Sequence, residues 1–153
     1  MDSKDFAQQY LLTEVEQMKA ANVRLHLLSA MVHGIETAGA LLDSLPFKAK
    51  GKGKTRFGIA LKKLFPAEYN QANLQIDLYS QLRSHMSHCM LPAKTITFSD
   101  DRHLHISQNM MNIVLDAFYD DYCCAMKLLI EQLESGKLKN KKIAFENLKS
   151  LET

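Results

Sequence analysis

Hydrophobic residues recur every three or four positions along most of this chain, with polar residues between them. That spacing places them on one face of an α-helix, the face that a helix buries. It predicts helices over residues 4–20, 23–45, 56–65 and 111–133. Pro46, Pro66 and Gly136 follow three of these segments, and each residue type ends a helix readily.

A further helix is predicted to start near Ala67 and to run through "QLRSHMSHCMLP", residues 81–92. Its core-facing stripe consists of Ala72, Ile76, Tyr79, Leu82, Met86 and Met90. A second stripe on another side runs through Leu74, Leu78, Gln81, His85 and His88. A helix with two such sides either sits centrally in a bundle or meets another chain, and the second alternative places Leu74 and Leu78 in a homodimer interface.

Residues 94–106 depart from the helical pattern. Thr95, Thr97 and Phe98 favour β-structure, "SDD" favours a turn, and residues 103–106 alternate. We therefore expect an all-α, up-and-down helical bundle with a small β-hairpin insertion at about residues 94–106.

The bundle is predicted to be a single domain of residues 1–136, followed by a basic tail over residues 137–153. The tail either stays frayed or forms a last amphipathic helix, the alternative that we favour. The apolar face of that helix would contain Leu138, Ile143, Leu148 and Leu151.

The composition indicates one soluble domain. The 153 residues are 46% hydrophobic, which is enough for one core, and the formal net charge is only +2, so any nucleic-acid site must be local. The three cysteines suggest no disulfide framework, and we see no secretory segment. Charges interrupt the apolar stretches before the ~20 residues that a membrane span needs. We expect a cytoplasmic protein without a membrane partner.

The segment "KAKGKGKTR", residues 48–56, is strongly basic. Its end resembles a Walker A motif, but that motif needs glycine at position 48, where this chain has lysine, and a strand before the loop. Two alternatives remain, a solvated loop or a surface that attracts a phosphate backbone. The residues that would bind nucleic acid are Lys48, Lys50, Lys52, Lys54 and Arg56.

The stretch from Arg83 to Cys89 allows several interpretations. His85, His88 and Cys89 share a helical side and could hold zinc together with His103 or His105, but no compact ligand motif supports this, so no metal or other cofactor is predicted. Alternatively, the cationic side chains only complete the last helical turn, where the helix dipole favours them.

A third interpretation comes from a family resemblance. Arg83, four intervening residues and His88, near a helix end in a helical domain, resemble the R-x-x-x-x-H element of the HEPN superfamily. The upstream "TRFGIALKKLFPAEY" is similar to a segment of bacterial HEPN-like proteins, and the resemblance covers roughly residues 20–134. Many active members have Asn, Asp or His directly after the arginine, where this chain has Ser84.

The resemblance implies a homodimeric endoribonuclease or RNA-binding protein of a toxin–antitoxin, defence or stress system, with RNA and an antitoxin-like protein as partners. Metal-independent RNA cleavage needs a proton shuttle, which histidine supplies, and a fixed cation on the phosphorane, which arginine supplies. We assign these roles to His88 and Arg83, with Ser84 orienting the imidazole. The alternative is a catalytically silent dimeric module that binds a protein or a nucleotide.

Overall fold

The structure is a computed structural model whose described part covers residues 1–143. It is mostly helical with a small three-stranded sheet, which confirms a helical fold with a β insertion. The helical elements are α1 (Ser3–Phe6), η1 (Ala7–Thr13), α2 (Glu14–Ala20), α3 (Arg24–Leu42), α4 (Gly53–Leu64), α5 (Ala67–Ile76), η2 (Tyr79–Ser84), α6 (His85–Cys89) and α7 (Leu115–Glu134). The strands are β1 (Ile96–Phe98), β2 (His105–Ser107) and β3 (Met110–Ile113).

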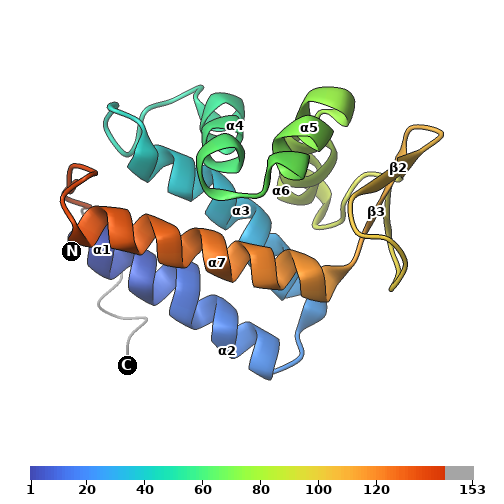
Figure 1. The fold of residues 1–153 in the computed structure, drawn as a ribbon, viewed down its shortest axis with the longest axis horizontal. Coiled ribbons are helices and arrows are strands. Elements are labelled where there is room, and N and C mark those ends of the chain that lie inside the picture. Colours follow the sequence, from blue (N-terminus) through green and yellow to red (C-terminus); the bar gives the residue numbers. More distant parts are fainter. Residues whose placement is uncertain (144–153) are drawn as a thin grey trace.

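The first helix and the last one form the lower half of the molecule in Figure 1. Elements α1, η1 and α2 follow one another without a break, η1 being π-helical, and together they pack on α7. Helix α7 separates this helix from the layer of α4 and α5, and the sheet lies at the end where α7 begins. The apolar faces that the periodicity predicts for the first helix and for α7 are thereby buried against each other.

Helix α3 is the central element and packs most extensively on α4. A Cβ atom on Gly39 would lie 1.9 Å from the carbonyl oxygen of Arg56, so the two helix backbones meet at this glycine. By length and composition α3 is apolar enough to cross a membrane, since Arg24 and Glu36 are its only charged residues and its mean hydropathy is 1.3. Within the protein 61% of that window is buried, as in a core helix.

The predicted continuous helix from Ala67 to Met90 is wrong. Helix α5 ends at Ile76, because Asp77 takes a left-handed conformation with φ of 54°. The Asp77 carboxylate then accepts hydrogen bonds from the backbone N–H of Ser80, at 3.3 Å, and from its hydroxyl, at 2.8 Å. Asp77 therefore ends one helix and caps the next, as short polar side chains do well.

This break changes which leucine faces the core. Leu78 is 2% exposed and lies among the core residues, so its assignment to a dimer interface is wrong. Leu74, on the other side of the break, is 78% exposed. The periodicity assumed one straight helix, whereas the helix restarts after Asp77 in a new orientation.

The β insertion is present, but its pairing differs from the predicted hairpin within residues 94–106. The strand order is β1-β3-β2, so β1 and β2 do not pair with each other. β1 pairs in parallel with β3, and β2 pairs antiparallel with β3 across a two-residue turn of Gln108 and Asn109, both with positive φ. Met111 thus lies in a strand, and α7 begins only at Leu115.

Residues 137–143 are not helical and return along the N-terminus. The backbone N–H of Ile143 donates to the carbonyl of Met1 at 3.0 Å, and Ser3 Oγ donates to the carbonyl of Lys141 at 3.1 Å. Lys141 Nζ reaches the Asp43 carboxylate at 3.0 Å, which ties this segment to the end of α3. The rest of the predicted tail helix, including Leu148 and Leu151, lies outside the described residues.

Candidate functional site

Arg83 pairs with a carboxylate on another helix. It lies in the π-helical element η2, and its Nε atom forms an ion pair with Oε2 of Glu36 on α3. Both atoms are buried, although the two side chains keep 26% and 21% of their surface exposed. The guanidinium is therefore held in place while one edge of it stays accessible.

Ser87 and His33 extend this pair into a polar network. Arg83 Nη1 donates to Ser87 Oγ at 2.7 Å, and Ser87 Oγ lies 2.9 Å from His33 Nε2. His33 Nδ1 lies 2.7 Å from the carbonyl oxygen of Ser29, one turn earlier on α3. Four polar side chains from α3, η2 and α6 thus form one network.

An aromatic ring and a helix start complete the surroundings of Arg83. The guanidinium carbon lies 6.0 Å from the centroid of the Tyr79 ring, a cation–π distance. A Cβ atom on Gly53 would lie 2.5 Å from Tyr79 Oη and 3.0 Å from Glu36 Oε1. The first turn of α4 therefore packs directly on the site, and a larger residue at its first position would have to displace the ends of the Tyr79 and Glu36 side chains.

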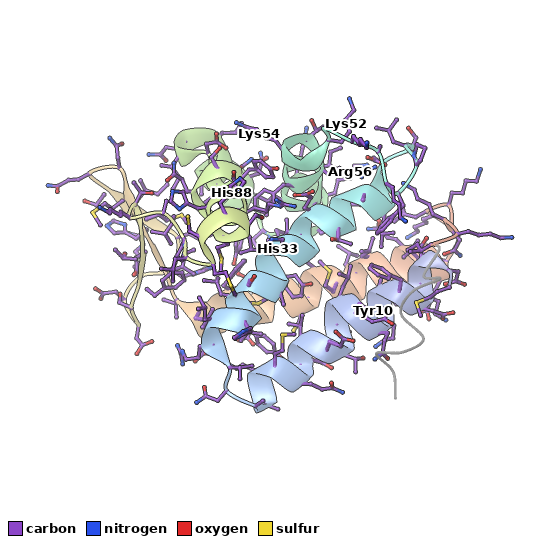
Figure 2. All side chains as sticks on the ribbon, turned by 180° about the vertical axis from the view of Figure 1, so that it is seen from behind. Tyr10, His33, Lys52, Lys54, Arg56 and His88 are labelled. Carbon is purple, nitrogen blue, oxygen red and sulfur yellow. The ribbon has the colours of Figure 1, made fainter. Side chains whose placement is uncertain are left out.

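The predicted catalytic residues are not all brought together. His88 is exposed at the end of α6, and it makes no hydrogen bond or ion pair within residues 1–143. The side chain of Ser84 likewise forms no hydrogen bond to His88 in that part of the chain, so the predicted orienting contact is absent there. Figure 2 shows His33 and His88 on the same side of the molecule.

The basic loop is only partly a free surface. Lys48, Lys50 and Lys52 are exposed and have no ion pair among the described residues, and Lys54 pairs with Asp77 at 2.6 Å. Lys52 and Lys54 lie beside the start of α4, on the side shown in Figure 2.

Arg56 is not available to nucleic acid, so its assignment as a phosphate-binding residue is wrong. It is 5% exposed, and its Nε donates to the Asp43 carboxylate at 2.7 Å. Its remaining nitrogens donate to the carbonyls of Pro46 and Phe47, each at 2.8 Å. The arginine fastens the loop from inside, and sequence alone did not distinguish it from the exposed lysines.

A second polar cluster lies at the base of a groove of about 460 Å³ between α5 and the sheet. The Tyr69 hydroxyl lies 2.8 Å from His103 Nε2 and donates to the Asp121 carboxylate at 2.8 Å. His103 Nδ1 accepts the backbone N–H of Val114, at 3.1 Å, just before α7. Burial lowers the pKa of His103, and Asp121 offsets part of that effect.

No role was predicted for His33, Glu36 or Ser87 from the sequence. The available signal was weak: His33 and Glu36, three residues apart, are two of several polar positions within the mainly apolar segment that forms α3. Their partner Ser87 lies 54 positions from His33, and no local pattern links residues so far apart.

Within residues 1–143 no group of three His, Cys, Asp or Glu side chains lies close enough to hold a metal ion. Comparison of the chain with protein-family models, curated proteins and solved structures gave no match. The interpretation of the site therefore depends on its own chemistry and on the motif of Arg83 and His88.

Proposed function

We propose that the protein is a HEPN-like, metal-independent endoribonuclease of a toxin, defence or stress system. One observation supports this most: Arg83 is oriented by Glu36, Ser87 and Tyr79, while its Nη2 makes no hydrogen bond within the described residues. A fixed, partly exposed guanidinium is suited to hold a phosphate and to stabilise the charge that develops on it.

The remaining roles follow from position and residue type. His88, five residues after the arginine in the chain and exposed at the end of α6, serves as a proton donor or acceptor, because an imidazole can do both. Lys48, Lys50 and Lys52 attract the RNA backbone in a salt-dependent way. Exposed Leu74 belongs to the contact surface of a homodimer, in an up-and-down bundle of the HEPN type.

RNA cleavage in the presence of EDTA tests this function. Purified protein is incubated with a mixture of single-stranded and structured RNA, and wild type is compared with His88→Ala and Arg83→Lys. We expect cleavage by wild type, and a loss of about 10²-fold or more in both variants, because each lacks a group that acts in the transition state.

His85→Ala is the matched control for His88→Ala, because His85 is also exposed on α6 and makes no hydrogen bond or ion pair within residues 1–143. It should cleave like wild type. Intact RNA with wild-type protein across pH 6 to 8, or equal cleavage by all variants, would exclude the proposed site.

One observation favours a second candidate, a catalytically silent interaction module that binds a protein or a nucleotide. The charge of Arg83 is already neutralised by Glu36 within the chain, as in a structural ion pair. Under this alternative Glu36→Gln lowers the thermal stability, and neither wild type nor variant cleaves RNA.

A further inference from the structure

We propose that His33 is the general base of the Arg83 site, and that the Ser87 hydroxyl occupies the position that a ribose 2′-hydroxyl takes in the complex. The inference rests on the proposed RNA cleavage and adds a catalytic residue that the R-x-x-x-x-H motif does not contain. It also divides the acid and base roles between two histidines.

The hydrogen bonds of His33 decide which of its nitrogens can accept a proton. A carbonyl oxygen only accepts hydrogen bonds, so the Nδ1 atom, 2.7 Å from the Ser29 carbonyl, must carry a hydrogen. In the neutral ring Nε2 is then the acceptor, and it points at Ser87 and not into its own helix. A base held by a hydrogen bond on its other nitrogen is the usual arrangement for proton abstraction.

The Ser87 hydroxyl lies between a base and a cation. Its oxygen is 2.9 Å from His33 Nε2 and 2.7 Å from Arg83 Nη1. It also lies 2.9 Å from the carbonyl oxygen of Arg83, so its single hydrogen has a second acceptor within its own helix. When the serine turns about χ1 into another staggered rotamer, its oxygen leaves His33 Nε2, and a hydroxyl of the substrate can take that position.

The three residues supply the base, the cation and the acid that the reaction needs. His33 Nε2 takes the proton of the 2′-hydroxyl, the O2′–P bond forms, and Arg83 holds the charged phosphorane. The P–O5′ bond then breaks, and the leaving oxygen takes a proton from His88. The products are a 2′,3′-cyclic phosphate and a 5′-hydroxyl end, and no oxidant or metal is required.

His88 is less suited than His33 to act as the base, because its ring is not held in a fixed orientation. It has no hydrogen-bond partner within residues 1–143 that would fix its ring. The His33 ring is held by the Ser29 carbonyl, and the Ser87 hydroxyl contacts both His33 and the Arg83 guanidinium. We therefore assign His33 to the step that needs a fixed lone pair, and His88 to the protonation of the leaving group.

The experiment measures the pH–rate profile of RNA cleavage with EDTA for wild type, His33→Gln and His33→Ala. Wild type should give a bell-shaped profile, and both variants should lose 10²-fold or more in kcat together with the rising limb on the acid side. Binding of an all-deoxy oligonucleotide, which cannot react, should be unchanged in both variants. His26→Ala is the control, because His26 is exposed on the same helix.

Ser87→Ala tests the role of the Ser87 hydroxyl separately from that of His33 as the base. It should keep the acid limb of the pH profile, because His33 remains, and it should lose much less rate than His33→Gln, although Arg83 loses one of the groups that orient it. A loss comparable with that of His33→Gln would overturn the role of Ser87 as a substitute for the 2′-hydroxyl.

The outcomes distinguish this inference from the function on which it rests. If wild type cleaves RNA and the folded His33 variants keep its rate and pH profile, His33 is not the base, although the RNase assignment stands. If wild type does not cleave at all, the proposed function is wrong and the role of His33 falls with it.

Discussion

Tyr69 and Tyr122 are both buried, and they differ in what their hydroxyl groups contact. The Tyr69 hydroxyl bonds His103 and Asp121, whereas the Tyr122 hydroxyl has no hydrogen-bond partner among the described residues. The Tyr122 hydroxyl packs directly against Gly34, where a Cβ atom would lie 2.1 Å from the hydroxyl oxygen. Burial raises the pKa of both phenols, so both remain neutral.

Tyr122→Phe should leave the free energy of unfolding unchanged or raise it by about 1 kcal/mol, because an unsatisfied buried hydroxyl costs about 1–3 kcal/mol. The loss of a few contacts at Gly34 offsets part of that gain. Urea denaturation monitored by circular dichroism measures the change.

Tyr69→Phe is the matched control, because the same atom is removed from a tyrosine with two hydrogen bonds. It should lower the stability by about 1–2 kcal/mol, because two hydrogen bonds are lost and the partly buried His103 and Asp121 side chains lose their partner. If both variants lost stability equally, the Tyr122 hydroxyl would have a partner after all.

At the scale of elements, the contact between α3 and α4 depends on Gly39. Gly39→Ala should lower the free energy of unfolding by about 3 kcal/mol, the upper part of the range for overpacking, because its Cβ would meet the backbone of Arg56 and not a movable side chain. The helices must then separate, and the change is measured by thermal and urea denaturation.

Gly58→Ala is the control within α4. The nearest atom to its Cβ would be Asn73 Nδ2 at 3.8 Å, an ordinary contact, so alanine should stabilise the helix by about 0.5–1 kcal/mol. A similar loss in both glycine variants would contradict the close approach at Gly39.

The sequence predicted those elements whose packing follows from one periodic face. α3, α4 and α7 were found for this reason, with boundaries displaced by up to four residues. The break at Asp77 was missed because an aspartate is compatible with the interior of a helix as well as with its end. Strand β3 was missed because its apolar residues run directly into the pattern of α7, and its parallel pairing with β1 is not local.

The contacts of the site also could not be predicted from the sequence, because they depend on how the whole chain folds. Arg83 could be selected from its motif, but its partners Glu36 and His33 come from α3, which only the tertiary fold brings to η2 and α6. The charge of Arg56 could not be distinguished from that of the neighbouring lysines, because burial against Asp43 is also a product of the fold. Chemistry inferred from a motif is therefore incomplete until the packing around it is known.

His103 joins three parts of the molecule, since it bonds Tyr69 of α5, faces Asp121 of α7 and accepts the N–H of Val114 after β3. Because burial lowers its pKa in the folded protein below the value of about 6.5 in an unfolded chain, the unfolded chain takes up the proton first as the pH falls. The contribution of His103 to stability is complete above the unfolded pKa and is lost as the pH falls towards the folded pKa.

The free energy of unfolding of wild type should therefore fall between pH 7.5 and pH 5. His103→Asn should make this dependence shallower, because its amide oxygen can still accept the Val114 N–H but does not titrate. His105→Asn is the control, since His105 is exposed and makes no hydrogen bond or ion pair within residues 1–143. An unchanged slope in His103→Asn would show that protonation does not disrupt this junction, and that the neighbouring Asp121 carboxylate compensates for the buried charge.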